Sequence, residues 1–471
     1  MRPVGVVGAG TMGAGIASLA AEARLRTLLY DPDPDALARA PEGVEAVRDL
    51  DALAHCGLVI EAAPEDLALK RELFARLAEV VQGDCVLATN TSSLSVTAVA
   101  AGLPHPECVV GMHFFNPPAR MRLVEVVAGE ASSPDSLRVA REAGEAMGKH
   151  VIDAADAPGF VVNRCNRPFG LEALRLVQDG VATPEQVDRV CRMAGGFRMG
   201  PFELMDLVGL DVGLAVSRSF YEQSFGEPRW RPSPLLARRA AAGHLGRKAG
   251  RGWYEYPPGR SADPEPPKPG GADGLVVVAG EGTVAGELAA AAENAGWDVA
   301  EPGDAEGEVP FLILDCGYQG EVPLQGGPQA ILVAVAPLAE LDPAGTGFHV
   351  VPPLGRLVEL TGRRQEPVER FFASLGMHLE HVGDAPGLVL GRIVAQLVNE
   401  AHFALGEGVA SAADIDAGMK LGLNHPRGPL EWGELWGLDA VLALLDGLQA
   451  EYREERWRPA PELLRAFRQL P

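Results

Sequence analysis

Residues 4–13, Val-Gly-Val-Val-Gly-Ala-Gly-Thr-Met-Gly, decide the fold of this chain. Their first half is a short apolar run, which predicts a β-strand, and the residues from Ala14 to Ala21 have the composition of a helix. The turn between them has the spacing G-x-G-x-x-G. Glycines at this spacing let a pyrophosphate approach the backbone amides at the helix N-terminus, where the helix dipole favours anions. The stretch predicts the opening strand, turn and helix of a dinucleotide-binding domain.

An acidic residue stands where such a domain would bind ribose. A second predicted strand, Thr27 to Tyr30, ends on Asp31, about 20 residues after the turn. A carboxylate there accepts hydrogen bonds from both ribose hydroxyls and repels a 2′-phosphate, so the cofactor is predicted to be NAD rather than NADP. The alternative is a solvated turn residue before Pro32. The turn residues predicted to contact NAD are Gly8, Ala9, Gly10, Thr11, Met12 and Gly13.

Two further apolar runs, beginning at Leu58 and Cys85, alternate with an amphipathic stretch from Asp66 to Val81. Strand, helix and strand in this order predict a parallel, doubly wound sheet. Ligands of such sheets bind at the carboxyl ends of the strands. The polar residues predicted at these ends are Glu65, Asn90, Ser92 and His113. For Ser92, a helix N-cap is a competing role.

His113 and Glu125 lie in two apolar runs separated by the turn signal Asn116-Pro-Pro118. If the runs pair, the two side chains meet. A carboxylate on one imidazole nitrogen fixes the tautomer and leaves the other nitrogen free to take a proton from a substrate hydroxyl. The alternative is a structural histidine in an apolar segment.

Together these motifs resemble the L-3-hydroxyacyl-CoA dehydrogenase family. The resemblance covers at least residues 1–256 and rests on Gly8-x-Gly-x-x-Gly13, Asp31, Asn90-Thr-Ser-Ser-Leu94, His113-Phe-Phe-Asn-Pro117, Leu123-Val-Glu-Val126, Pro158-Gly-Phe-Val-Val-Asn-Arg164 and Gly200-Pro-Phe-Glu-Leu-Met-Asp206. It implies NAD-dependent, reversible oxidation of a 3-hydroxyacyl-CoA to the 3-ketoacyl-CoA, in fatty-acid or phenylacetate-type catabolism.

The resemblance also implies roles for single residues. His113 would be the general base on the 3-hydroxyl and Glu125 its partner, while Ser92 and Asn163 would donate hydrogen bonds to the substrate. The residues implied to contact NAD are Glu65, Lys70, Ser92, Asn116 and Lys248. For Lys70 the alternative is a solvated lysine on an exposed helix face.

One departure from the family weakens the expectation of CoA. Pro32 to Gly57 is too short for the helical hairpin that usually extends over this moiety. Two rivals therefore stay open: a gulonate-type dehydrogenase of a non-thioester 3-hydroxy acid, and a non-catalytic NAD- or CoA-binding scaffold. The acyl chain length is open as well, and so is the presence of a terminal carboxylate, for which Arg120, Arg122 and Arg164 are candidate partners.

Composition limits the partners. The chain has 471 residues, a net charge of −23 and a pI near 4.9, which argues against nucleic acid or an anionic membrane surface. Its six cysteines show neither metal spacing nor C-x-x-C and are expected to be reduced. The first strand begins by Val4, which leaves no room for a signal peptide, and no apolar run is long enough to span a membrane. A cytoplasmic protein without a metal site is expected.

The second half repeats the first. Asp384-Ala-Pro-Gly387 repeats Asp156-Ala-Pro-Gly159 at an offset of 228 residues, and the stretch with His349 and Glu359 echoes the one with His113 and Glu125. Gly391 replaces Asn163, so the second His–Glu pair is interpreted as a fossil rather than a second active pair. Between Pro302 and Pro310, acids, glycines and prolines stand where a full sheet would have a helix.

The predicted fold is an α/β Rossmann domain followed by an all-helical domain, then a reduced Rossmann-like domain and a second helical domain, formed by internal duplication. The predicted limits are 1–155 for NAD binding, 156–256 for the first helical domain, 257–274 for a linker, 275–380 for the reduced domain without cofactor, and 381–471 for the second helical domain. Matching apolar faces in both helical domains predict a pseudo-dimer within the chain, which itself is a monomer or a homodimer.

Overall fold

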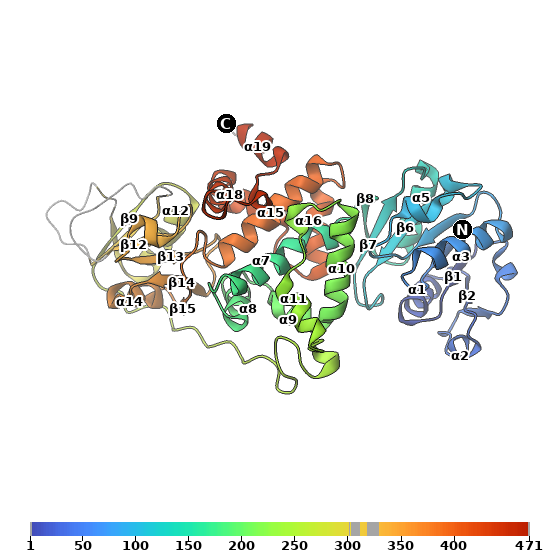
Figure 1. Cartoon of the computed structure of the whole chain (residues 1–471), viewed down its shortest axis with the longest axis horizontal. Helices are drawn as coiled ribbons and strands as arrows, with labels where there is room; N and C mark the ends of the chain where they lie inside the picture. The colour runs from blue at the N-terminus through green and yellow to red at the C-terminus, as the bar shows by residue number, and fades with distance from the viewer. Residues whose placement is uncertain (1, 301, 303–310, 318–328, 470–471) are drawn as a thin grey trace. The chain divides into compact units, whose positions relative to one another are not determined.

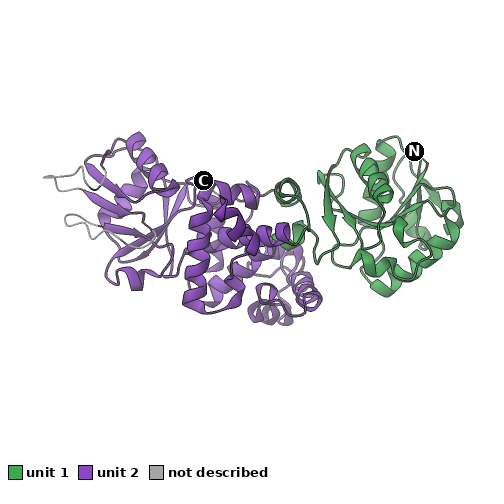
Figure 2. Cartoon of the chain, turned by 90° about the horizontal axis from the view of Figure 1, so that it is seen from above, with its two compact units in different colours: residues 1–165, 407–424 green, residues 166–406, 425–471 purple. Residues whose placement is uncertain are grey.

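The computed structural model describes residues 2–300, 302, 311–317 and 329–469 (Figure 1). The chain divides into two compact units (Figure 2). Unit 1 comprises Met1–Cys165 and Glu407–Asn424, and unit 2 comprises Asn166–Gly406 and His425–Pro471. A segment of the second half therefore belongs to the unit that holds the first Rossmann sheet, and the division cuts across the predicted domain limits.

Unit 1 contains an eight-stranded sheet in the order β3-β2-β1-β4-β5-β6-β7-β8, in which only β6 and β7 are antiparallel neighbours. This is the doubly wound arrangement that the sequence predicts. The strands are β1 (Val4–Val7), β2 (Thr27–Tyr30), β3 (Glu45–Val47), β4 (Leu58–Glu61), β5 (Val86–Thr89), β6 (Val109–Phe114), β7 (Leu123–Ala128) and β8 (His150–Ala155).

The helices of unit 1 follow the predicted alternation. Asp66 caps α3 by accepting a hydrogen bond from the amide of Leu69, so the predicted helix after residue 66 is confirmed. The helical segments are α1 (Thr11–Glu22), α2 (Pro34–Leu37), η1 (Leu50–Leu53), α3 (Leu67–Val80), α4 (Val96–Ala100), η2 (Pro106–Cys108), α5 (Pro134–Ala146), α6 (Val162–Cys165) and α16 (Ala412–Leu423). Residues 32–57, which are all described, contain only α2, β3 and η1, so no long hairpin is present there.

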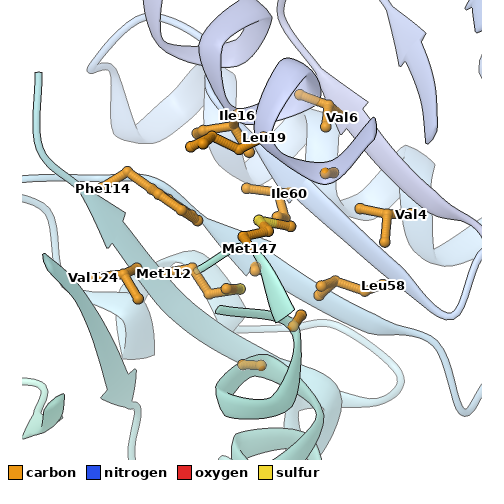
Figure 3. Packing of buried hydrophobic residues seen from close by; sticks show 14 of the residues in the cluster. Val4, Val6, Ile16, Leu19, Leu58, Ile60, Met112, Phe114, Val124 and Met147 are labelled. Atoms are coloured by element: carbon orange, nitrogen blue, oxygen red, sulfur yellow. The ribbon is translucent and has the colours of Figure 1, made fainter. Parts of the chain in front are cut away.

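One apolar core joins the glycine turn to the strand of His113. Val4 and Val6 of β1 and Ile16 of α1 are buried in the same cluster as Met112 and Phe114 of β6 (Figure 3). Because β1 leads into the glycine turn and β6 carries His113, this shared core fixes the turn and His113 on one sheet.

Unit 2 contains a seven-stranded sheet in the order β10-β9-β11-β12-β13-β14-β15, with β13 and β14 antiparallel. Its strands are β9 (Leu275–Ala279), β10 (Asp298–Ala300), β11 (Leu312–Asp315), β12 (Gln329–Leu332), β13 (Thr346–His349), β14 (Leu357–Gly362) and β15 (His378–His381). The order repeats that of the first sheet without a counterpart of β3 among the described residues, which agrees with the predicted reduced copy. Residues 303–310, within the stretch expected to lack a helix, lie outside the described residues.

The helices of unit 2 come from both helical regions and from the reduced Rossmann-like region. None of the helices in the described part of the chain is long and apolar enough to cross a membrane. The helical segments of unit 2 are α7 (Arg167–Gln178), α8 (Pro184–Met193), α9 (Pro201–Val208), α10 (Leu210–Gln223), η3 (Pro228–Trp230), α11 (Pro234–Ala241), η4 (Arg247–Ala249), α12 (Thr283–Ala295), α13 (Leu338–Leu341), α14 (Glu366–Ser374), α15 (Leu390–Gly406), α17 (Pro429–Trp436), α18 (Leu438–Tyr452), η5 (Glu455–Trp457) and α19 (Pro461–Arg468).

Candidate active site

His113 and Glu125 meet as the sequence predicts. Strands β6 and β7 are antiparallel, with His113 directly opposite Glu125, and the distance from His113 Nδ1 to Glu125 Oε2 is 2.5 Å. The imidazole lies between aromatic rings, with centroid distances of 4.5 Å to Phe115 and 5.9 Å to Phe160. The histidine is 6% exposed and the glutamate fully buried. The pair is thus enclosed by protein on the side of Nδ1.

Glu125 is held by two backbone amides. Its Oε1 accepts hydrogen bonds from the N–H groups of Val161 and Val162, at 3.1 and 3.0 Å. Oε2 is left for the imidazole. Because a carboxylate only accepts hydrogen bonds, the proton of His113 is on Nδ1 and its Nε2 carries a lone pair. The fixed carboxylate therefore selects the tautomer that a general base requires.

Ser92 and Asn163 also lie together. The side-chain amide of Asn163 donates to the backbone oxygen of Ser92 over 3.3 Å. Ser92 is exposed and does not cap a helix, because Ser95 caps α4 by accepting from the amide of Ala98. The competing N-cap role for Ser92 is therefore wrong. Its side chain remains accessible at the carboxyl end of β5.

Glu65 fixes the loop that carries Ser92. Its Oε1 accepts hydrogen bonds from the Thr91 hydroxyl at 2.6 Å and from the amides of Ser92 and Ser93, both at 3.0 Å. Burial alone would raise the pKa of Glu65, but these hydrogen bonds and the charge of Lys70 hold it below its usual value. Glu65 is therefore an anion that orders the loop.

Lys70 is not a solvated surface lysine, and that alternative is wrong. Its side chain is fully buried, and Nζ lies 2.6 Å from Glu61 Oε1 and 3.6 Å from Glu65 Oε2. Glu61 also accepts a hydrogen bond from the hydroxyl of Thr89 on the next strand, at 2.7 Å. Sequence reasoning missed Glu61, although an acid that ends an apolar strand was a signal that a buried cation balances it. Glu61 therefore joins Lys70 of α3 to Thr89 at the end of β5.

The glycine turn has room for a dinucleotide. Gly8 has φ +103°, and a Cβ at Gly13 would stand 1.8 Å from the Gly8 oxygen, so side chains are excluded where strand and helix approach. A Cβ at Gly10 would meet nothing within 4 Å. Asp31 Oδ2 accepts from the amide of Ala9 at 2.6 Å, which places the acid beside the turn. Thr11 and Met12 open α1. These residues fit a pyrophosphate and a ribose.

Asn90 ties β5 to β6. Its Oδ1 accepts a hydrogen bond from the amide of Phe114, over 2.8 Å. Asn116 is exposed at the start of the turn between β6 and β7, with Arg120 and Arg122 exposed further along. The buried Lys149 donates to two carbonyl oxygens of this turn, those of Pro118 at 2.6 Å and Met121 at 2.8 Å. No sequence motif pointed to Lys149.

Two further predicted residues form ion pairs with acids of the chain. Lys248 belongs to unit 2 and forms an exposed ion pair with Asp211 at 2.7 Å. Arg164 is 1% exposed and forms an ion pair with Glu407 at 2.8 Å. The burial of this guanidinium against a carboxylate of the protein itself argues against Arg164 as the receiver of a substrate carboxylate.

His349 and Glu359 keep the strand register of His113 and Glu125 but not their hydrogen bond. His349 faces Glu359 across β13 and β14. Both Glu359 oxygens accept backbone amides, from Val389 at 2.7 Å and Leu390 at 3.0 Å, and among the described residues His349 Nδ1 has no hydrogen-bond partner. Burial lowers the pKa of His349 to about 3 and raises that of Glu359 to about 8.

Gly391 explains why an asparagine has no place in this copy. A Cβ there would stand 2.4 Å from His349 Cε1, so the imidazole occupies the space of any larger side chain. These observations favour the interpretation of a fossil pair.

Comparison with known proteins gives the chain its family. The NAD-binding domain of 3-hydroxyacyl-CoA dehydrogenases matches residues 3–48 and 39–157, and their C-terminal domain matches twice, at residues 159–256 and 387–469. The second match supports the duplication. A 3-hydroxyadipyl-CoA dehydrogenase of Escherichia coli K12 is 37% identical over 98% of this chain and 96% of that protein.

A crystal structure titled 3-hydroxybutyryl-CoA dehydrogenase, also from Escherichia coli K12, covers 99% of this chain and 98% of its own, with 35% identity and a TM-score of 0.83. The human mitochondrial hydroxyacyl-coenzyme A dehydrogenase is 34% identical over 54% of this chain and 91% of that protein. The chain therefore belongs to the 3-hydroxyacyl-CoA dehydrogenase family and is an NAD-dependent oxidoreductase of that class.

Proposed function

We propose that His113 is the general base and acid of this enzyme and that Glu125 orients it. The observation that carries the proposal is the 2.5 Å contact between His113 Nδ1 and the buried Glu125 carboxylate. Within the described part of the chain Nε2 makes no hydrogen bond, so it is available to a substrate. General acid–base help of this kind contributes about 10²–10⁴-fold to the rate.

In the forward reaction the 3-hydroxyl proton moves to His113 Nε2, and the C3–H bond breaks with both electrons. NAD⁺, which the glycine turn and Asp31 would hold, would supply the acceptor for this hydride. Ser92 and Asn163 orient the substrate oxygen through their side-chain donors, and Glu125 stabilises the imidazolium that forms. In the reverse direction His113 returns the proton. Glu65, Lys70 and Asn116 support the cofactor side, with Lys70 acting through Glu65 because its own side chain is buried.

The substrate we propose is a 3-hydroxyacyl-CoA whose acyl chain ends in a carboxylate. Support comes from the relative named 3-hydroxyadipyl-CoA dehydrogenase, which matches nearly the whole chain. Arg120 and Arg122 are exposed on the turn after His113, and neither forms an ion pair among the described residues. In a chain of net charge −23, two unpaired cations beside the reaction centre suit an anionic substrate group. A short 3-hydroxybutyryl chain is the second candidate, because the full-length structural match carries that name.

Oxidation of NADH with a panel of substrates tests the proposal. We expect turnover with acetoacetyl-CoA, faster turnover with 3-ketoadipyl-CoA and none with free acetoacetate; turnover of the free acid alone would favour a gulonate-type enzyme. Arg120→Gln is expected to slow the dicarboxylic substrate selectively. His113→Gln is expected to abolish turnover while NAD⁺ binding persists, and unchanged turnover would overturn the proposed role of His113.

We also propose that the second half acts as a built-in partner for the first. The equivalent helices α7 and α15 pack against each other in unit 2, where Arg392 forms a fully buried ion pair with Glu172 at 3.1 Å. We therefore expect a monomer of 49.6 kDa in sedimentation velocity, independent of loading concentration.

All six cysteines are free, and five of them are buried, which fits a reducing, cytoplasmic setting.

A further inference from the structure

Helix α16 of the second half packs directly behind the residues that hold Glu125. A Cβ at Gly418 would stand 3.1 Å from Ile152 Cδ1, 3.2 Å from Val162 Cγ2 and 3.3 Å from Val161 Cγ1. One turn later, a Cβ at Gly422 would stand 3.0 Å from Leu123 Cδ2 and 3.2 Å from Val162. These distances are tighter than ordinary van der Waals contact, so an added atom must displace its neighbours by a few tenths of an ångström, and Val161 and Val162 are among them.

The residues just before α16 make two polar contacts with the rest of unit 1. The backbone oxygen of Val409 accepts a hydrogen bond from the amide of Ala155, at the end of β8, over 2.8 Å. The carboxylate of Glu407 lies 2.8 Å from the guanidinium of Arg164, on α6, which directly follows Asn163 in the chain. A buried arginine needs such a counter-charge, because an unpaired buried ion costs several kcal/mol.

Hydrogen bonds of Glu125 connect these contacts to His113. Val161 and Val162 donate both of their amides to Glu125 Oε1, and the other oxygen of Glu125 holds His113. A displacement of the two valines therefore moves the carboxylate and the imidazole with it. Misplacement of a catalytic group by about 1 Å can cost about 10²-fold in rate.

We propose that residues 407–424 are a positioning element for the Glu125–His113 pair, acting through Gly418, Gly422 and Glu407. The proposal rests on the roles assigned above to His113 and Glu125. None of the three is among the residues assigned above to the substrate or to NAD⁺. The second half thereby contributes to the chemistry of the first, although its own His–Glu pair lacks the hydrogen bond.

Unit 2 contains the reciprocal arrangement, in which each residue is replaced by its counterpart in the other repeat, 228 residues away. The amide of Gly383 donates to the oxygen of Val181 at 2.6 Å, as Ala155 does to Val409. Asp179 lies 3.6 Å from the buried Arg392, as Glu407 lies beside Arg164. Because the two copies share these contacts, substitutions in unit 2 provide matched controls.

Gly418→Ala tests the proposal against Gly433→Ala. Gly433 is also a helix glycine, and its Cβ would stand 3.1 Å from Leu438 and from Val398, all within unit 2. We expect both variants to lose thermal stability. Only Gly418→Ala should lower kcat per folded molecule, by about five- to twentyfold, while KM for the acyl-CoA stays unchanged, because the variant misplaces the base without altering the binding of the substrate. NAD⁺ affinity should be unchanged.

Glu407→Gln and its counterpart Asp179→Asn form the second comparison, which remains informative if a glycine variant does not fold. We expect kcat per folded molecule to fall in Glu407→Gln alone, with KM for the acyl-CoA unchanged. If Gly418→Ala and Glu407→Gln behave as their unit 2 controls do, the positioning role is overturned. If His113→Gln itself retains turnover, the proposed function fails instead, so the two failures are distinguishable.

Discussion

Replacement of Glu125 by glutamine removes one charge and changes almost no volume. The carbonyl oxygen of the new side chain can still accept the amides of Val161 and Val162, so the fold keeps two of the three hydrogen bonds that Glu125 makes. The third position now presents an NH₂ group to His113. Because an NH₂ group only donates, the imidazole must accept at Nδ1 and carry its proton on Nε2.

The tautomer therefore decides the size of the effect. Loss of one charge-assisted hydrogen bond is worth about 1.5–3 kcal/mol, or roughly 10- to 150-fold. A proton on Nε2 additionally removes the lone pair that receives the substrate proton, and with it the general-base factor of about 10²–10⁴. We expect kcat of Glu125→Gln to fall by about 10²–10⁴-fold, with little change in NAD⁺ affinity or thermal stability.

The measurement is steady-state oxidation of 3-hydroxybutyryl-CoA, followed by NADH absorbance, together with NAD⁺ titration calorimetry. Glu359→Gln is the matched control, because Glu359 holds two equivalent amides in the second copy but makes no hydrogen bond to His349 among the described residues. It should leave kcat per folded molecule unchanged. A decrease of less than about threefold in Glu125→Gln would refute the tautomer argument.

Three further predictions concern the cofactor side and the second copy. Lys70→Met leaves the buried Glu61 carboxylate without its cation, so urea unfolding should show a loss of about 3–5 kcal/mol, partly recovered by adding Glu61→Gln; a loss below about 1 kcal/mol would contradict a buried ion pair. Asp31→Ser should weaken NAD⁺ binding by about tenfold in calorimetry while NADP⁺ binding changes little, and an equal loss for both would argue against ribose recognition. Burial lowers the pKa of His349 to about 3, so the unfolded chain binds a proton between pH 6.5 and 3 that the folded chain does not, and stability falls as pH falls through this window. His349→Leu removes this pH dependence. The unfolding free energy of the variant minus that of the wild type should therefore rise by up to about 1.4 kcal/mol for each pH unit of acidification. If the two unfolding free energies change equally with pH, the buried neutral state of His349 is disproved.

The features that the sequence predicted correctly depend on neighbours within one or two elements. The glycine turn, the position of Asp31 beside it and the strands around them follow from local spacing. His113 and Glu125 meet because Asn116-Pro-Pro118 turns one strand into the next, and the register of an antiparallel pair then sets their contact.

The features that the sequence did not predict depend on distant partners. Lys70 lies in an amphipathic helix, where a lysine usually faces water, and only the fold brings it to Glu61 on β4. The placement of residues 407–424 in unit 1 has no local signal at all. The repeat did contain a signal for these ion pairs: Arg164 and Arg392 are 228 residues apart, and so are the acids Asp179 and Glu407.

The composition of unit 1 has a consequence for biosynthesis. Its first piece ends at Cys165 and its last begins at Glu407, so residues 166–406 leave the ribosome between the two. A nascent chain can close the eight-stranded sheet early, yet the helix behind Glu125 is delivered only near the end of translation. Contacts this far apart in sequence form slowly. Newly made molecules should therefore bind the dinucleotide before they acquire full turnover.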